Sequence, residues 1–309
     1  MDALLQQLEA FINYLKFEKR FSENTLSAYH ADLTQFFDFL SVQYPDTKLP
    51  NVDAFMIKSW IASLKENKLP KTHSATSNKS IHRKISSLKS FYKYLLRENV
   101  VAQTPLAAIV LPKINKRLPS FLKEKEAQQL IEPKKIEEGK KYWEQRTEQL
   151  IVKLFYETGI RLSELVNLKE SNFDASYRQI KVTGKGNKER IIPLSQDMLR
   201  DMQLYLSEKP CKIAGVDNFF VSEKGKALYA KKVYNAVKSQ MSDNGILLKK
   251  KSPHVLRHTF ATHLMNNGAD MNAVKELLGH TSLAATQVYT HTGIEQLKEV
   301  YRKAHPKAT

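Results

Sequence analysis

The sequence predicts a mainly α-helical protein with two domains and one small antiparallel β-sheet, which falls in the second domain. Apolar residues recur at helical spacing over most of the 309 residues. Only one short region alternates apolar and polar residues as a β-hairpin does. A proline-rich stretch divides the chain into two segments, each long enough to bury its own core.

The first segment, residues 1 to about 110, is predicted to contain four helices. Their apolar stripes are, in chain order, Leu4, Leu8, Phe11 and Leu15; Leu26, Tyr29, Leu33, Phe36 and Leu40; Ile57, Trp60, Ile61 and Leu64; and Ile81, Ile85, Leu88, Tyr92 and Leu95. The other faces of the fourth helix carry basic side chains, among them Lys79, Arg83, Lys84 and Lys89. The fourth helix is therefore strongly amphipathic.

Prolines and basic residues then mark a linker. Pro112 and Pro119 flank a short basic stretch, and proline restricts both helix continuation and the residue before it. We therefore assign an N-terminal domain, a linker and a C-terminal domain to residues 1–112, 113–125 and 126–309.

The second segment opens with an apolar helical run over 150–158. Gly159 is predicted to break this helix and Ser163 can start the next one, which leaves Arg161 at the junction. An arginine at such a junction is usually a surface residue. Glu164 could hold a neighbouring arginine side chain by a charge-assisted hydrogen bond.

A β-hairpin is predicted next. The stretch 180–183 alternates as a strand does, 190–194 is its partner, and 184–187 forms the turn between them. The glycines of this turn do not make a phosphate-binding P-loop, because that motif needs a Gly-Lys-Ser/Thr end before a helix. The hairpin therefore gives no sign of nucleotide hydrolysis.

Three short helical segments between Ser252 and His291 carry a set of polar side chains. Ser252 is predicted to cap the first helix, with Pro253 in its first turn. On that helix His254, Arg257 and His258 share one face. The second helix covers 271–278 and ends at Gly279 and His280, and the third segment carries Tyr289. Each of these residues taken alone is more often structural, but together they can build a compact polar pocket.

The charge of the chain indicates its kind of partner. A formal net charge of +17 and a pI near 9.6 favour a polyanion, most often nucleic acid, over an anionic membrane surface. No long apolar segment and no signal peptide are recognisable. The single cysteine, Cys211, excludes a disulfide framework and a thiolate metal cluster, and no acidic cluster suggests a two-metal site. We expect a cytoplasmic, DNA-binding protein without cofactor or metal, with the basic face of the fourth helix against phosphates.

Three motifs together resemble the C-terminal signature of the tyrosine recombinases of the phage integrase family, most closely the Xer type. They are T-G-x-R-x-S-E-L at 158–165, H-x-x-R-H at 254–258, and L-G-H at 278–280 followed by Y-T-H at 289–291. R-F-S-x-N-T at 20–25 and Y-x-x-D-L at 29–33 resemble the DNA-clamping N-terminal domain of the same family. The resemblance implies a two-domain, C-shaped DNA clamp with a SAM-like first domain.

The resemblance also implies a set of catalytic residues, namely Arg161, Lys185, His254, Arg257, His280 and Tyr289. Tyr289 matches the nucleophile, and His254 is a candidate base. Lys185 matches the mobile lysine of the hairpin, with Lys188 as the competing assignment for the general acid. Lys249, Lys250 and Lys251, just before the His254 helix, are expected to contact the DNA backbone.

A member of this family would cut and rejoin DNA through a 3′-phosphotyrosyl intermediate, without metal or ATP. The resemblance implies DNA with paired half-sites and a tetrameric synaptic assembly, which can include a paralogous recombinase and a cell-division DNA translocase. Chromosome dimer resolution at a dif-like site, in chromosome partition during cell division, is the leading hypothesis for the function. The target sequence is not evident from the residues.

Three other functions stay open at this point. An integrase of a mobile element shares the motifs, although large phage integrases often carry a further N-terminal domain for which we see no room. A non-catalytic DNA-binding protein would not need the full catalytic set, and a type IB topoisomerase fits the motif spacings less well.

A last amphipathic stretch, 294–304, can dock on its own domain, whereas the family donates such a helix to a neighbouring subunit.

Overall fold

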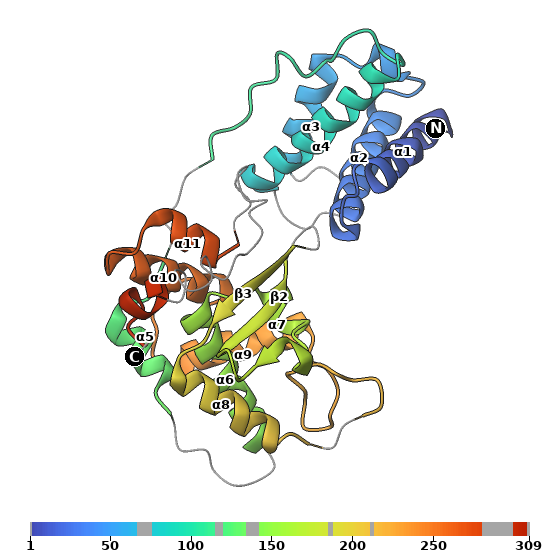
Figure 1. Ribbon diagram of the computed structural model, residues 1–309. Coiled ribbons are helices and arrows are strands. Elements are labelled where there is room, and N and C mark those ends of the chain that lie inside the picture. Colours follow the sequence, from blue (N-terminus) through green and yellow to red (C-terminus); the bar gives the residue numbers. More distant parts are fainter. Residues whose placement is uncertain are drawn as a thin grey trace. The chain divides into compact units, whose positions relative to one another are not determined.

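The computed structural model divides the chain into two compact units, residues 1–117 and 118–309 (Figure 1). The structure describes residues 2–66, 76–114, 120–133, 142–184, 188–210, 213–279 and 299–307. The mainly α-helical class with a small antiparallel sheet is confirmed. No helix in these ranges is long and apolar enough to cross a membrane.

Unit 1 is helical in its described part. Its elements are α1 (Asp2–Asn13), a π-helical turn (Tyr14–Glu18), α2 (Glu23–Gln43), a 3-10 turn (Leu49–Asn51), α3 (Ala54–Glu66) and α4 (Asn78–Arg97). The four apolar stripes predicted from the sequence form its core, with Tyr29 only half-buried at the edge. Burial of one stripe per helix against the other helices is what stabilises such short helices.

Unit 2 packs helices around a three-stranded sheet. Its elements are α5 (Glu124–Ile131), α6 (Tyr142–Thr158), α7 (Leu162–Val166), a 3-10 turn (Glu170–Asn172), β1 (Phe173–Asp174), β2 (Gln179–Thr183), β3 (Glu189–Pro193), α8 (Gln196–Ser207), α9 (Ala230–Asp243), α10 (Pro253–Asn266) and α11 (Met271–Leu277). The sheet is antiparallel throughout, in the order β1-β2-β3. The predicted hairpin is β2 and β3; β2 begins one residue earlier than predicted, and β3 both begins and ends one residue earlier. The two-residue strand β1 was not predicted.

The central helix of unit 2 is α6, which contacts α5, α8, α9 and α10 (Figure 1). Its last turns are buried on nearly all sides, at residues 150–152 and 154–158. A helix that is buried all round is surrounded by other elements. This position fixes the end of α6, and with it the junction to α7, inside the packed unit.

Two boundary features differ from the sequence predictions. Ser252 is at the N-cap position of α10, but its hydroxyl makes no capping hydrogen bond, so the predicted side-chain cap is wrong. Helix α7 begins at Leu162, one residue before the predicted start, because the Glu164 side chain caps the backbone N–H of Arg161. Arg161 is thus the first residue outside the helix.

The described part of the C-terminal stretch packs on its own unit. Residues 299–304 are helical, and Tyr301 and Ala304 are buried against α10 and α11. His305 follows, stacked on Tyr301 with 5.1 Å between ring centroids. The described residues of 294–304 therefore dock on their own chain, and donation of this stretch to a neighbouring subunit stays a prediction.

The buried carboxyl group of Glu157, near the end of α6, gives a test of the fold. Burial raises the pKa of Glu157 to about 7, against the opposing charge of Lys153 and a 2.7 Å hydrogen bond from Ser195 Oγ. A carboxyl group whose pKa is raised on folding lowers the free energy of unfolding when the pH is above the raised pKa, because the charged form is then buried. At a pH below the pKa of the unfolded chain the group is protonated in both states and has no such effect. Glu157→Gln should therefore raise the free energy of unfolding by up to ~3 kcal/mol near pH 8, and the gain should vanish as the pH falls towards 4.

Denaturant unfolding at several pH values measures this effect. The control is Glu223→Gln, which changes an exposed carboxylate of the same unit and should leave the free energy of unfolding unchanged at every pH. A gain that is the same near pH 4 and pH 8 would show that the charge of Glu157 is not its cause.

Candidate active site

A buried carboxylate, that of Glu164, lies at the centre of an arginine cluster in unit 2. Its side chain is only 1% exposed. Its Oε1 accepts a hydrogen bond from Arg161 Nη1 at 2.7 Å and a second one from Arg190 Nη1. Its Oε2 accepts from the Arg161 backbone N–H at 2.8 Å and from Arg190 Nη2 at 2.9 Å. The prediction that Glu164 holds a neighbouring arginine is confirmed, and Glu164 in fact binds two.

Three arginines from different elements also bind three consecutive carbonyl groups at the end of α11. The hydrogen bonds run from Arg190 Nε to Leu277 O at 3.1 Å, from Arg257 Nη2 to Leu278 O at 2.6 Å, and from Arg161 Nη2 to Gly279 O at 2.8 Å. The last carbonyls of a helix have no partner within it, and basic side chains can satisfy them. The backbone directly before His280 is thereby attached to β3, α10 and the start of α7.

Gly159 makes the close packing at the α6–α7 junction possible. Its φ is +59°, and a Cβ at this position would lie 2.5 Å from the Phe260 ring and 2.9 Å from Leu278. Its carbonyl accepts a hydrogen bond from Arg257 Nη1. The predicted helix break at Gly159 is confirmed, and the left-handed conformation, which glycine adopts without strain, turns the chain towards Arg161.

The cluster carries an excess of positive charge. Burial, together with the nearby charges of Arg161 and Arg190, lowers the pKa of Arg257 to about 9. Burial on its own would raise the pKa of Glu164, but the hydrogen bonds and charge of Arg190, and those of Arg161, bring it below its usual value. Three guanidinium groups therefore lie near a single carboxylate, which binds two of them, so the site is electrostatically suited to an anion such as a phosphate.

The structure brings two of the six predicted catalytic residues, Arg161 and Arg257, into this cluster. Lys185, His280 and Tyr289 lie outside the described residues. The neighbour of Lys185 is described: a Cβ on Gly184 would lie 3.4 Å from Glu164 Oε1 and 3.7 Å from Arg161 Nη1. The base of the hairpin turn is thus at the cluster. Lys188, the alternative to Lys185, is exposed, and its carbonyl accepts from the Gly184 N–H at 2.7 Å.

His254 lies on α10, one turn before Arg257, and is exposed. No hydrogen bond joins His254 to the cluster in the described part of the chain. Just before α10, Lys249 and Lys250 are exposed, while Lys251 is half-buried and donates to Ser242 Oγ at 3.1 Å. These three lysines therefore stay predictions for DNA contact, and Lys251 has a partner within the protein.

The predicted basic face of unit 1 contains an internal ion cluster. Asp32 is buried and accepts hydrogen bonds from Arg83 and, at 3.0 Å, from Lys84 Nζ. The Lys84 side chain is 12% exposed, against 50% for Arg83. Lys79 and Lys89 are exposed on α4. Three of the four predicted residues thus present charge to solvent, whereas Lys84 mainly neutralises a buried carboxylate.

The sequence analysis did not single out Arg190 as a site residue. Arg190 pairs across the sheet with Val182, and its side chain is 4% exposed. The signal was present, because the alternation of β3 puts Arg190 on the same inward face as Ile192. A charged residue at an inward strand position predicts a buried partner of opposite charge.

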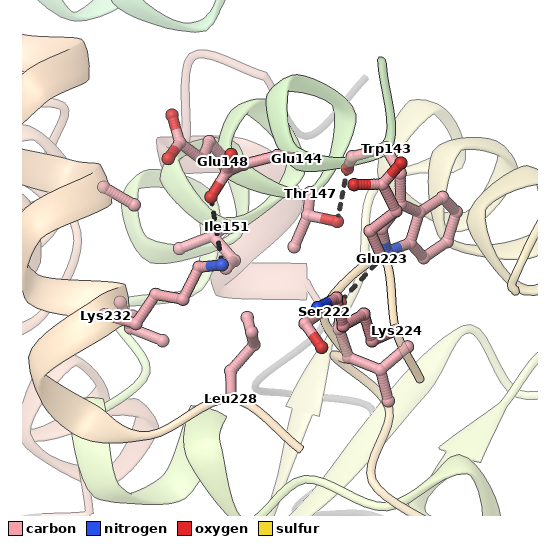
Figure 2. A pocket seen from close by; sticks show the side chains of 13 residues that line it. Trp143, Glu144, Thr147, Glu148, Ile151, Ser222, Glu223, Lys224, Leu228 and Lys232 are labelled. Atoms are coloured by element: carbon pink, nitrogen blue, oxygen red, sulfur yellow. Dashed lines mark hydrogen bonds and ion pairs between the residues drawn. The ribbon is translucent and has the colours of Figure 1, made fainter. Parts of the chain in front are cut away.

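A separate cavity of about 190 Å³ lies between α6, α9 and the segment 221–228 (Figure 2). Several polar groups at its wall already have partners within the protein: Trp143 Nε1 donates to Val221 O at 3.0 Å, and Lys232 pairs with Glu144 at 2.9 Å. It shares no lining residue with the arginine cluster. We therefore assign the candidate active site to the cluster and not to this cavity.

Comparison with known proteins shows which family the chain belongs to. Residues 120–295 match the model of the phage integrase family, and residues 8–99 match the phage integrase N-terminal SAM-like domain. Tyrosine recombinase XerC of Anoxybacillus flavithermus is 37% identical over 306 residues, covering 97% of this chain and 98% of the relative. Tyrosine recombinase XerC of Staphylococcus aureus is 38% identical over 303 residues, covering 97% and 96%.

Solved structures show the same relationship. XerH site-specific recombinase bound to palindromic difH substrate, in a post-cleavage complex, matches with a TM-score of 0.67 and 25% identity over 96% of this chain and 84% of that one. A Tn1549 transposon integrase in complex with circular intermediate DNA matches with a TM-score of 0.67 at 20% identity, which shows the shared fold.

The chain belongs to the phage integrase family, whose members are tyrosine recombinases. It is an enzyme of the Xer type, which breaks and rejoins DNA strands in site-specific recombination. The resemblance drawn from the three sequence motifs is confirmed, and DNA is the partner that the basic composition predicted.

Proposed function

We propose that this enzyme recombines DNA at a dif-like site through a covalent 3′-phosphotyrosyl bond to Tyr289, and that it resolves chromosome dimers. The arginine cluster is the observation that carries the proposal. Arg161 is held by the carboxylate of Glu164 and by Gly279 O, and Arg257 is held by two backbone carbonyls, so their positions are set before DNA arrives. Stabilisation of the transition state by prearranged donors of this kind is usually the largest single contribution to the rate enhancement of an enzyme.

Both arginines keep donors for a phosphate. A guanidinium has five N–H groups, and in the described part of the chain Arg161 and Arg257 each use two of them on protein acceptors. The Arg161 side chain is 30% exposed. The remaining N–H groups can bind the non-bridging oxygens of the scissile phosphate, whose negative charge grows in the transition state.

The other steps are proton transfers. In cleavage, the Tyr289 oxygen would form a bond to phosphorus while the bond from phosphorus to the 5′ oxygen breaks. A tyrosine hydroxyl has an unperturbed pKa near 10, so its proton must leave during the attack, and His254 is the proposed acceptor. Lys185 would donate a proton to the departing 5′ oxygen, and His280 would add a hydrogen bond to the phosphate. Rejoining reverses each transfer, and no nucleotide is consumed because one ester replaces another.

The assembly on DNA is also a proposal. XerH is bound to a palindromic difH substrate in its solved complex. For this chain we propose paired half-sites, a tetrameric synapse in the cytoplasm, and cooperation with a paralogous recombinase and a cell-division DNA translocase. We further propose that residues 1–112, with the exposed Lys79, Arg83 and Lys89, form a DNA-binding domain that closes a clamp with the catalytic domain after the 113–125 linker.

The test uses a nicked suicide substrate carrying a candidate dif-like site, which traps the intermediate because the cut fragment diffuses away. The protein should form an adduct that resists denaturation, and it should do so in excess EDTA. DNA binding without any adduct would identify a non-catalytic DNA-binding protein. Dependence on a divalent metal, or relaxation of supercoiled DNA that has no recombination site, would also contradict the proposal.

A further inference from the structure

We propose that Arg190 is a positioning residue, whose buried guanidinium keeps Arg161 free to bind the scissile phosphate. The inference rests on the proposed function. Arg190 is on β3, next to the turn that contains Lys185, and its side chain is 4% exposed. It is too buried to touch DNA, so any role in the reaction must act through other residues.

The first part of this role is competition for the Glu164 carboxylate. Arg190 binds both carboxylate oxygens, through Nη1 to Oε1 and through Nη2 to Oε2. Arg161 therefore contacts Glu164 with only one side-chain nitrogen, Nη1, and uses Nη2 for Gly279 O at 2.8 Å. Arginine and carboxylate otherwise prefer to pair by two parallel hydrogen bonds. Without Arg190, Arg161 would turn towards both oxygens and away from the phosphate.

The second part is the connection to the segment that leads to His280. Arg190 Nε donates to Leu277 O at 3.1 Å. Gly279 has a φ of +62°, and a Cβ there would lie 2.9 Å from Arg190 Cδ, so the backbone passes directly over the Arg190 side chain. One guanidinium plane thus sets the distance between α7, the β2–β3 hairpin and the end of α11.

A lysine cannot reproduce this arrangement. Its single ammonium keeps the charge beside Glu164, but it cannot bind both carboxylate oxygens and a carbonyl at the angles of a planar fork. Arg190→Lys therefore separates the geometry of Arg190 from its charge. Arg178→Lys is the matched control, because Arg178 directly precedes β2 in the same unit and is exposed.

The experiment measures the single-turnover rate of adduct formation on the nicked suicide substrate, together with DNA affinity. Arg190→Lys should slow adduct formation about 100-fold, the effect of a displacement near 1 Å in a reacting site, while the Kd for DNA changes less than about threefold. Arg178→Lys should match the unaltered protein. An Arg190→Lys rate equal to that of the unaltered protein would overturn the positioning role alone. Absence of adduct from the unaltered protein would overturn the proposed function itself.

Two further measurements separate positioning from general support of the fold. In a protein that already carries Arg161→Ala, the Arg190→Lys change should slow adduct formation little further, because both changes act on the same phosphate contact. A substrate with a methylphosphonate in place of the scissile phosphate has one negative charge fewer at the cleavage site. On this substrate, Arg190→Lys should slow adduct formation less than it does on the normal phosphate. Additive losses, with equal defects on both substrates, would show that Arg190 only supports the fold.

If Arg190→Lys does not fold, Gly279→Ala is the second variant: its Cβ presses on the Arg190 side chain and leaves the guanidinium chemically intact, while the φ of +62° adds backbone strain at the same point. Its defect should likewise depend on Arg161 and on the charge of the phosphate. A folded Gly279→Ala protein with an unchanged rate would overturn the proposal.

Discussion

Replacing Tyr289 with phenylalanine should abolish the covalent protein–DNA adduct and leave DNA binding nearly unchanged. The substitution removes the single oxygen that is proposed to bond to phosphorus, and no water or metal hydroxide can replace it in an adduct to protein. The phenyl ring keeps the shape of the side chain. The measurement is adduct yield on the nicked suicide substrate after denaturation, beside a binding titration on intact DNA.

Tyr177→Phe is the matched control, because Tyr177 is an exposed tyrosine of the same unit. It should form adduct at the rate of the unaltered protein. Equal adduct yields from Tyr289→Phe and Tyr177→Phe would assign the nucleophile to another residue. Loss of DNA binding by Tyr289→Phe would instead assign that residue to the fold of the DNA-binding surface.

Replacing Arg257 with alanine should slow adduct formation roughly 100- to 1,000-fold, about 3 to 4 kcal/mol of transition-state stabilisation for one charged donor. Burial and the positive charges of Arg161 and Arg190 lower the pKa of Arg257 to about 9. A phosphate at the cluster offsets this repulsion, most of all when its negative charge grows in the transition state. The loss should therefore appear in the rate of the covalent step more than in the Kd for DNA.

Arg200→Ala tests whether removal of any arginine has the same effect. Arg200 lies on α8 with a side chain that is 68% exposed, and it forms an ion pair with Asp197 of the same helix. Its removal should change the adduct rate less than about twofold, as for most exposed pairs. If Arg257→Ala weakens DNA binding as much as it slows cleavage, Arg257 supplies ground-state affinity and not transition-state stabilisation.

The helical architecture could be predicted from the sequence because burial imposes a period on it. Each apolar stripe, such as Ile81, Ile85 and Leu88, marks the helix face that is buried away from water. Strand β1 could not be predicted, because two residues contain no period and only pairing with β2 defines them. The N-terminal cap of α10 was predicted at the right residue, but whether the Ser252 hydroxyl bonds depends on the surrounding packing.

The candidate active site could also be predicted from the sequence only in part. Arg161, Glu164 and Arg257 are recognisable from motifs, whereas the bond from Arg161 to Gly279 joins residues 118 positions apart and the bond from Arg257 to Leu278 joins α10 to the end of α11. Such contacts leave no local pattern in the sequence. Arg190 was missed because an arginine in a short strand is ordinarily an exposed one, and only the inward phase of β3 indicates otherwise.

The three successive carbonyls at the end of α11 have a consequence for how this backbone can move. Each is bound by an arginine from a different element, so movement of this backbone away from the cluster would break all three hydrogen bonds. We expect this stretch to behave cooperatively, bound either by all three arginines or by none.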